Sequence, residues 1–287
     1  MGDAPLRHGG RFSFFLAAVC LATSLAAQRP KISVNTVVDA AAAYLVDYQK
    51  QFSFVLADET YSQTVTGGLA PGPRQRTTAG ESFLTFATAN HGWISVRDVA
   101  TVDGVPVPDR EDLRALLQGG GVPRMEQQLA ERNSRYNIGT ITRNFNEPTI
   151  GLLVFERLKD DEFKFDLKRI EMDGAATLAT LAFKEKGPST LVHGLDHRAV
   201  YSTGEVVVEA ETGRIRRTFL ELKYGPVVAQ LTTVYASVPA LGLWVPVRFQ
   251  ERYEQTQFRN TLNAHEVIVC DAHYTNHRRF EVTVRIK

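Results

Sequence analysis

Cys270, His273 and His277 form a cluster of side chains in this sequence that could do chemistry. A thiolate and two imidazoles can bind zinc, and a cysteine beside a histidine can act as a nucleophile. Successive strand residues alternate between the faces of a sheet, so Cys270 and His273 point apart unless a turn intervenes, for which Asn276 is available. The pattern favours a buried thiol beside surface histidines, with a metal site or a Cys/His-dependent enzyme as the alternatives.

A second pair of histidines, His193 and His197, is spaced four apart in His-Gly-Leu-Asp-His. On a helix this spacing would place both on one face, but Gly194 and the preceding Gly187-Pro188 favour a loop. The glutamate of a His-Glu-x-x-His metalloprotease is also missing. We therefore expect a solvated loop here.

The remaining motifs do not predict a catalytic centre or a cofactor. The neighbouring pairs Asp196-His197 and His265-Glu266 diverge if they lie on strands. The sequence contains no Gly-x-Ser-x-Gly elbow. Gly119-Gly120-Gly121 lacks the Gly-Lys-Ser/Thr ending of a phosphate loop and is interpreted as a linker.

The first residues predict export. Arg7 and Arg11 precede an apolar run, Phe12 to Leu25, and Ala26 and Ala27 supply the small residues that a signal peptidase requires. We expect residues 1–27 to be a cleaved signal peptide and the mature chain to be periplasmic or secreted. An uncleaved anchor is the alternative, although the run is shorter than the roughly 20 apolar residues of a membrane span.

Removal of the signal peptide leaves a chain with equal numbers of positively and negatively charged residues. It takes two of the 33 Lys and Arg residues and one of the 32 Asp and Glu residues, which leaves 31 of each. This balance argues against general electrostatic binding of nucleic acid. Cys20 also leaves, so Cys270 has no internal disulfide partner, and no later segment is long and apolar enough to span a membrane. We expect residues 28–287 to form a single domain.

The hydrophobic periodicity predicts a mainly β fold of the α+β class. An N-terminal helix capped by Ser33 or Asn35 is indicated by apolar residues at helical spacing: Val38, Ala41, Ala42, Leu45, Tyr48 and Phe52. From Phe52 the period becomes two, which predicts Phe52, Phe54 and Leu56 on the buried face of a strand. A glycine-rich loop over Gly67 to Gly80, strands over Glu81 to Ala89 and Trp93 to Val102, and a turn at Asp103-Gly104 follow.

The middle of the chain predicts helices. Asp109 can cap one that carries Leu113, Leu116 and Leu117, and Pro123 and Pro148 open two more. The third has Ile150, Leu153 and Val154 on one side. Residues 109–155 are interpreted as a helical insertion packed on the sheet, because they are too few to bury a core alone.

The rest of the chain predicts an antiparallel meander. The expected strands are Glu162 to Met172, Ala175 to Phe183, Gly204 to Glu211, Arg214 to Tyr224, Val227 to Ser237, Leu243 to Tyr253, His265 to Cys270 and Arg278 to Ile286. If Thr212-Gly213 is a hairpin tip, Glu211 faces Arg214 and Glu209 faces Arg216 on a wet side. The buried side then carries Val206, Val208, Ala210, Ile215 and Phe219, with Arg217 laying its stem on the core.

This order of elements resembles the LolA/LolB-like, lipoprotein-carrier-like fold. The supporting residues are Gly204-Glu-Val-Val-Val, Glu211-Thr-Gly-Arg214, Leu241-Gly-Leu-Trp-Val-Pro246, Glu251-Arg-Tyr253 and Tyr274 through Phe280. The segments Trp93-Ile-Ser-Val-Arg-Asp98 and Ser134-Arg-Tyr-Asn-Ile-Gly139 resemble uncharacterised exported proteins of acidobacteria. The resemblance implies a curved half-barrel sheet covered by helices, with lipid held on the concave side. It offers no lipid-binding motif to transfer.

The leading hypothesis is an exported, non-catalytic protein that binds a lipid or another apolar ligand on the concave face of its sheet. The expected contacts are Phe52, Phe54, Leu56, Leu84, Phe86, Arg217 and Phe219. In the alternative, side chains fill the concavity, and the Arg74/Arg76 loop or a free sheet edge binds an envelope protein. The third hypothesis is a Cys/His-dependent or metal-dependent enzyme that uses Cys270 with His273 or His277.

Overall fold

The structure is a computed structural model. It describes residues 2, 32–52, 55–68, 72–87, 92–108, 110, 131, 134–143, 147–160, 162–187, 190–194, 196–259 and 262–279. The expected signal peptide lies outside these residues apart from Gly2. Most of the expected insertion, including the helices begun by Asp109 and Pro123, also lies outside them.

The expected N-terminal helix is confirmed as α1, Val34–Gln51. Ser33 forms a capping box: its hydroxyl oxygen accepts from the Thr36 backbone N–H at 3.2 Å, and its own N–H donates to the Thr36 hydroxyl at 3.0 Å. Two backbone N–H groups of the first turn are thereby satisfied. The buried stripe that packs on the sheet comprises Val37, Val38, Ala41, Leu45 and Tyr48.

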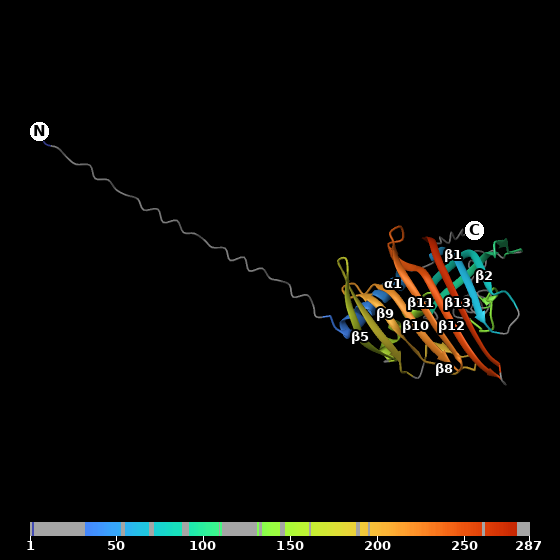
Figure 1. Cartoon of the computed structure of the whole chain (residues 1–287). Helices are drawn as coiled ribbons and strands as arrows, with labels where there is room; N and C mark the ends of the chain where they lie inside the picture. Colours follow the sequence, from blue (N-terminus) through green and yellow to red (C-terminus); the bar gives the residue numbers. More distant parts are fainter. Residues whose placement is uncertain are drawn as a thin grey trace, which may run out of the picture. The chain divides into compact units, whose positions relative to one another are not determined.

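The described strands form one large sheet in which every neighbouring pair is antiparallel. Its spatial order is β4 (Val105–Pro106), β3 (Gly92–Val102), β2 (Gln75–Ala87), β1 (Val55–Gly67), β13 (Leu262–Arg279), β12 (Leu243–Arg259), β11 (Val227–Val238), β10 (Ile215–Tyr224), β9 (Ser202–Glu209), β6 (Ala176–Glu185) and β5 (Phe163–Asp173). A small hairpin of β7 (Val192–His193) and β8 (Ala199–Val200) lies between β6 and β9 in the chain. The predicted mainly β, antiparallel architecture is confirmed (Figure 1).

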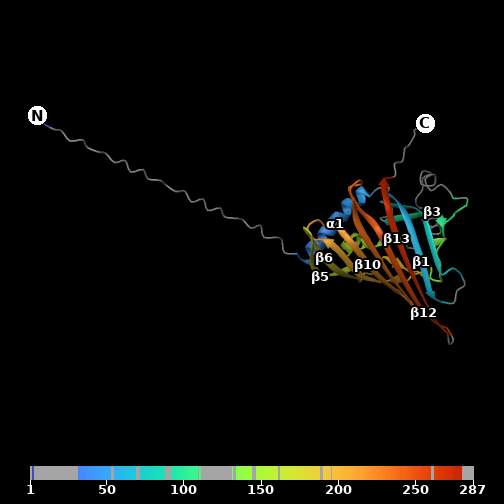
Figure 2. The same ribbon diagram turned by 45° about the horizontal axis from the view of Figure 1, so that its top comes forward.

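The sheet is curved (Figure 2). It is open, because β4 and β5 form its two opposite edges among the described strands. Helix α1 and the 3₁₀ helix η1 (Ile150–Asp160) pack against each other, and they contact strands β5, β9 and β10. The helix that we expected after Pro148 is therefore present as η1, with Ile150, Leu152 and Val154 buried. One main cluster of buried apolar side chains joins α1, η1 and the inner side of the sheet.

The predicted inner face of the first strand is wrong. Phe52 is the C-cap of α1, and β1 begins at Val55. The odd-numbered residues from Val55 to Val65 are buried, whereas Thr60, Ser62 and Thr64 are exposed. The expected alternation was counted from Phe52, which belongs to the end of the helix, whereas the inner face of β1 is formed by its odd-numbered residues.

The predicted register of the hairpin between β9 and β10 is also wrong beyond Ile215. Val208 is paired with Ile215, but Val207 is paired with Arg217, so a bulge adds one residue to β10. After the bulge, Thr218, Leu220 and Leu222 are buried on the inner side. Phe219 is paired with Glu205 on the outer side, where it is half-buried. The bulge thus reverses the face that simple alternation assigns to Arg217 and Phe219.

Three other strand boundaries differ from expectation. Strand β2 begins at Gln75, inside the predicted loop. The strands expected over His265 to Cys270 and Arg278 to Ile286 belong to one strand as far as Arg279. Asn276, the expected turn residue, has φ of 50° within β13, where the pairing with β1 is irregular. The turn at Asp103-Gly104 is confirmed, with φ values of 50° and 80°.

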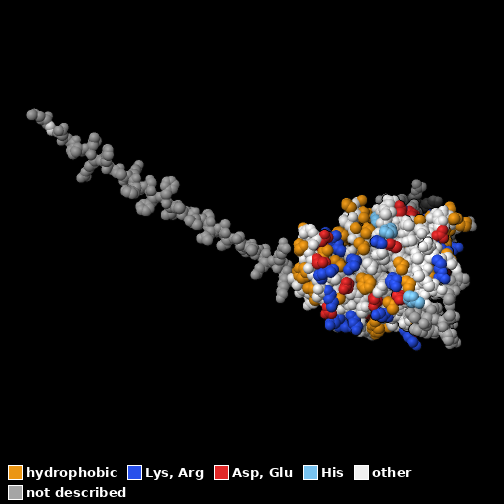
Figure 3. Space-filling model, viewed as in Figure 1, with side chains coloured by type: hydrophobic (Ala, Val, Ile, Leu, Met, Phe, Trp, Pro, Cys, Tyr) orange, Lys and Arg blue, Asp and Glu red, His pale blue; other side chains and the backbone are white. Residues whose placement is uncertain are grey.

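The outer side of the sheet carries charges of both signs, interspersed across the face in Figure 3. Arg248 makes a two-bond ion pair with Asp271 at 2.6 and 2.9 Å, and Glu254 contacts both Arg252 and His265 at 2.8 Å. Within the described residues, no helix has the length and apolar character needed to cross a membrane.

Candidate ligand-binding site

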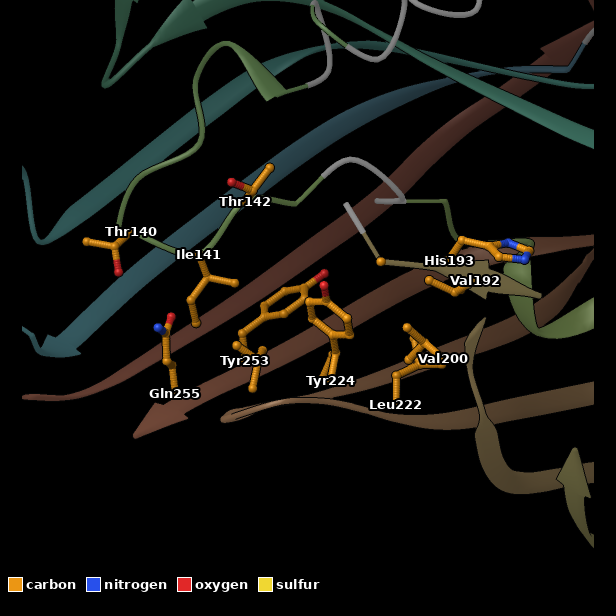
Figure 4. A pocket seen from close by; sticks show the side chains of 13 residues that line it. Thr140, Ile141, Thr142, Val192, His193, Val200, Leu222, Tyr224, Tyr253 and Gln255 are labelled. Carbon is orange, nitrogen blue, oxygen red and sulfur yellow. The ribbon is translucent and has the colours of Figure 1, made fainter. Parts of the chain in front are cut away.

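An open pocket of about 190 Å³ lies on the inner side of the sheet, where β10, β11 and β12 meet the 140–142 loop and the β7–β8 hairpin. Figure 4 shows Thr140 and Gln255 at one end of the pocket and His193 at the other. Most of the lining is apolar. The lining residues are Thr140, Ile141, Thr142, Val192, His193, Gly194, Val200, Leu222, Tyr224, Val227, Ala229, Tyr253 and Gln255.

Strand alternation explains the floor of this pocket. Leu222, Ala229 and Tyr253 lie on three adjacent strands and are paired in register, Leu222 with Ala229 and Ala229 with Tyr253. Residues that face each other in a sheet share a face, so the three side chains form one continuous surface. All three are buried. Ala229 is the smallest of them and leaves room above the sheet.

One wall of the pocket, the β7–β8 hairpin, is fixed by the buried carboxylate of Glu185. Its Oε1 accepts from the Leu191 backbone N–H at 2.7 Å, and its Oε2 accepts from both the backbone N–H and the hydroxyl of Ser202 at 2.8 Å. Glu185 is only 1% exposed. Because the hydrogen bonds reach residues on both sides of the hairpin, a single side chain holds its two ends together.

The mouth of the pocket is polar. Tyr224, which is 37% exposed, hydrogen-bonds the side chain of Asp196, and this bond raises the pKa of Tyr224 and lowers that of Asp196. Gly194 lies against the Tyr224 ring, where a Cβ atom would come within 2.4 Å of Cε2. The glycine therefore allows the hairpin to close onto the tyrosine.

The opposite wall, the loop 137–142, is held by the buried Arg143. The guanidinium donates to Cys270 Sγ at 2.9 Å, to Gln63 Oε1 at 2.8 Å and to the Ile138 carbonyl at 2.9 Å. These acceptors are neutral groups, and Arg143 is 1% exposed. Thr140 adds two 2.8 Å hydrogen bonds, from its N–H and its hydroxyl, to Glu266 Oε1. The loop is thus fixed to β1 and β13.

Further charged groups are buried on the inner side of β1, β3 and β12. Glu59 and Arg97 form an ion pair at 2.9 Å with both side chains at most 5% exposed, and the Arg97 guanidinium lies 4.0 Å from the Tyr61 ring centroid. Burial disfavours the Arg97 charge, but Glu59 together with Tyr61, Tyr274 and Glu251 outweighs this, so the pKa of Arg97 lies above its usual value. The Tyr253 hydroxyl donates to buried Glu251 at 2.5 Å. The inner face is therefore apolar near α1 and polar near β1.

The expected ligand contacts do not form one wall. Phe52 packs on Tyr48 at the end of α1, with ring centroids 4.9 Å apart. Leu84 belongs to the main cluster. Leu56 is buried outside that cluster, on the opposite face of the sheet with its cross-strand partner Phe83. Phe54 and the side chain of Phe86 lie outside the described residues.

The other two expected contacts, Arg217 and Phe219, are on the outer side. The Arg217 guanidinium lies 4.0 Å from the Glu205 carboxylate, and its side chain is 43% exposed. The expected pairing of Glu209 with Arg216 is confirmed at 2.6 Å, but Glu209 is buried and not on a wet side. Glu211 accepts from the backbone N–H and the hydroxyl of Thr177, and Arg214 lies 3.5 Å from Glu209 Oε2. Neither Arg217 nor Phe219 lines the pocket.

The cysteine and histidine candidates are separated by the sheet. Cys270 is buried on the inner side, and burial raises the pKa of its thiol to about 12. His273 lies on the outer side, 3.5 Å from Asp271. His277 contacts the Pro246 carbonyl at 2.9 Å, and burial lowers its pKa. Among the described residues, no three side chains from His, Cys, Asp and Glu come together as a metal site would require.

None of the lining residues of the pocket was among the contacts expected from the sequence. Alternation along β10–β12 could have identified Leu222, Ala229 and Tyr253 as one surface once their register was known. The two walls carry no such signal: Ile141 lies in an irregular loop, and Val192 and Val200 lie on two-residue strands.

No protein-family model and no curated protein matches the sequence. Two solved structures are similar in fold. One is an outer membrane lipoprotein-sorting protein domain from Vibrio parahaemolyticus, with a TM-score of 0.33, 7% identity, and coverage of 86% of this chain and 95% of that one. The other is a DUF1329 family protein from Desulfovibrio piger ATCC 29098, with a TM-score of 0.33, 9% identity, and coverage of 88% and 95%.

Proposed function

We propose that this protein is a non-catalytic binding protein that takes an apolar group of a small amphiphile into the pocket over Leu222, Ala229 and Tyr253. The observation that carries the proposal is an open, mostly apolar pocket whose two walls are fixed by separate hydrogen-bond networks. The ligand contacts in this proposal are the lining residues of the pocket, and they replace the contacts expected from the sequence.

The size of the pocket limits the ligand. A dry engineered cavity of about 150 Å³ accepts benzene, and the pocket here measures about 190 Å³. Typical sites for drug-sized molecules begin at about 300 Å³. The pocket thus fits one aromatic ring or a short stretch of an alkyl chain, and the remainder of a larger ligand extends through the mouth.

The alternative role as an envelope interaction module requires side chains to fill the concavity. They do so near α1, where Leu45, Phe52 and Tyr235 are buried. The open pocket lies at a different place, beyond Leu222. For this reason we favour binding of an apolar ligand.

The test is uptake of a fluorescent alkyl probe by the purified protein, compared with an Ala229→Trp variant. The indole would occupy the pocket, so probe binding should fall at least about tenfold, as expected when favourable burial of a few methylenes is lost. Thr232→Trp is the matched control, because Thr232 lies on the outer side of the same strand and is half-buried. No probe binding by the unmodified protein, or equal binding by Ala229→Trp, would contradict the proposal.

We also propose export to the periplasm or the extracellular space, on the basis of the charged start, apolar run and small residues before Gln28. N-terminal sequencing of the protein recovered from an expressing bacterium should begin at Ala27 or Gln28. A mature chain that retains Arg7 and Arg11 would show that this is not a cleaved signal peptide.

A further inference from the structure

A second, polar pocket lies beside the apolar one. It also measures about 190 Å³, and its charged lining residues are Arg74, Arg76 and Glu266. The loop 137–142 separates the two pockets: Asn137, Ile138 and Gly139 line the polar one, whereas Thr140, Ile141 and Thr142 line the apolar one. The two pockets are therefore neighbours on the inner side of the sheet.

The register of the sheet shows how close they are. Gln255 of the apolar pocket is the direct cross-strand partner of Glu266 of the polar pocket. Thr140 bridges them, because it lines the apolar pocket and donates two hydrogen bonds to Glu266 Oε1. A molecule that occupies both pockets would cross the loop at Thr140.

Glu266 lines this pocket and has one carboxylate oxygen without a hydrogen-bond partner among the described residues. The residue is 3% exposed, and Oε1 accepts both hydrogen bonds from Thr140. Oε2 is buried and has no hydrogen-bond partner among the described residues. A buried carboxylate oxygen without a donor is costly, and an N–H group or an ammonium of a ligand would satisfy it.

Arg76 supplies the complementary donor. Its Nη1 donates to the Tyr136 carbonyl at 3.2 Å. Its Nε is buried, has no hydrogen-bond partner among the described residues, and lies 4.0 Å from Asp103 Oδ2. Arg74 adds a second guanidinium to the lining. Guanidinium groups are suited to phosphate oxygens.

We infer that the polar pocket binds the zwitterionic head group of the amphiphile, with a primary ammonium at Glu266 and a phosphate at Arg76. This inference rests on the proposed function, because a short stretch of the alkyl chain of the same molecule occupies the apolar pocket. The chemistry is that of a phosphoethanolamine group. The phosphoethanolamine group can belong to a lipid or to a free water-soluble molecule. Only the lipid also carries an alkyl chain.

The test compares head groups on one chain by calorimetric titration below the micelle concentration. The probes are dodecanoyl lysophosphatidylethanolamine, the matching phosphatidylcholine and phosphatidylglycerol lyso-lipids, and neutral dodecyl maltoside. The ethanolamine lipid should bind at least about tenfold more tightly than the choline lipid, which has no N–H donor, and the glycerol lipid, which has no cation. Free glycerophosphoethanolamine should bind at least about tenfold more weakly than the ethanolamine lipid, because it lacks the chain.

The Glu266→Gln variant sharpens the test. The glutamine carbonyl can keep both Thr140 bonds, while its NH₂ group replaces the Oε2 acceptor with a donor. The preference for ethanolamine over choline should disappear, and binding of dodecyl maltoside should not change. Arg76→Gln, on a half-buried side chain, should instead weaken all three phosphate lipids relative to the maltoside.

The outcomes separate the two proposals. If dodecyl maltoside binds but the three phospholipids bind equally, or if Glu266→Gln keeps the ethanolamine preference, the head-group inference is wrong and the apolar site stands. Tight binding of free glycerophosphoethanolamine would overturn the lipid source. If no alkyl probe binds at all, both proposals are wrong.

Discussion

The Glu185 carboxylate and Ser202 are joined by two hydrogen bonds of 2.8 Å, one from the serine backbone and one from its hydroxyl. Together with the 2.7 Å bond from the Leu191 N–H, they close the base of the β7–β8 hairpin. The position of one pocket wall therefore depends on a carboxylate at the end of β6.

Replacement of Glu185 by alanine should loosen this wall and destabilise the protein. Three donors lose their acceptor, and each buried donor left without a partner costs about 1–3 kcal/mol, so we expect a loss of about 3 kcal/mol or more in the free energy of unfolding. Urea titration measures the loss, and amide hydrogen exchange should show faster exchange over residues 190–202. Glu205→Ala, which removes a half-exposed outer carboxylate, should change stability by no more than about 0.5 kcal/mol. Equal effects of the two substitutions would contradict the assigned role of Glu185.

The buried Glu59–Arg97 ion pair predicts that the free energy of unfolding depends strongly on both residues. Glu59→Leu alone should cost about 3–5 kcal/mol, because it leaves the Arg97 guanidinium buried without this carboxylate. Glu59→Leu combined with Arg97→Met should cost clearly less than the sum of the two single substitutions. A double-mutant cycle by chemical denaturation measures the coupling. Additive losses would show that the two charges do not interact in solution.

Cys270 should behave as an inert thiol at neutral pH. With the thiol pKa raised to about 12 by burial, alkylation by iodoacetamide should require unfolding and should speed up with added urea. Rapid stoichiometric labelling of the native protein near neutral pH would contradict this expectation.

The raised pKa of Cys270 also predicts that the protein loses stability at alkaline pH. The unfolded chain loses the Cys270 proton near the usual thiol pKa of 9.0, whereas the folded state keeps it to higher pH. The stability from this group is therefore complete below pH 9 and is lost as the pH rises towards about 12. Cys270→Ala should reduce the alkaline loss of stability relative to the unmodified protein. The part that remains in the variant comes from other groups, among them Tyr44, whose pKa burial raises to about 12. Identical alkaline slopes for the two proteins would rule out a contribution from Cys270.

Gly204→Ala should destabilise the sheet through a steric clash. A Cβ atom at this position would lie 2.0 Å from the Phe219 carbonyl oxygen and 2.6 Å from Cζ of Phe183. Because a backbone atom must shift, we expect a loss of about 2 kcal/mol or more by thermal or chemical unfolding. Gly174→Ala is a useful comparison, since its Cβ would meet nothing within 4 Å and only its φ of 59° is unfavourable, which costs about 1 kcal/mol. A larger effect at Gly174 than at Gly204 would be inconsistent with this packing.

The parts of the fold that depend on local patterns could be predicted from the sequence. Ser33 and the apolar stripe of α1 predict the helix, and Asp103-Gly104 predicts the turn after β3. Alternation failed where one residue changed the phase: Phe52 ends α1, and the bulge after Ile215 moves Phe219 to the outer side. A period of two carries no information about such insertions, and a single shift exchanges the two faces.

The pocket could not be predicted in the same way. Ile141, Val192 and Tyr253 come from three separate segments, and their meeting depends on Glu185 and Arg143, which fix the hairpin and the loop. Neither anchor lies in a motif that indicates its role. The register of β10–β12 and the paths of the two connections decide which side chains surround the space.

The pairing of β1 with β13 has a consequence for the order of folding. Val55 is paired with Arg279, so the first and last described strands of the sheet are neighbours near its middle. Strands β2–β4 join the rest of the sheet only through this seam, and no partner for β1 on that side exists until almost the whole chain is available. Contacts of such high sequence separation slow folding. During synthesis from the N-terminus, β1 and β2 therefore remain without a partner strand on the β13 side until the end of the chain has been made. We expect the pairing of β1 with β13 to complete the sheet in one late step.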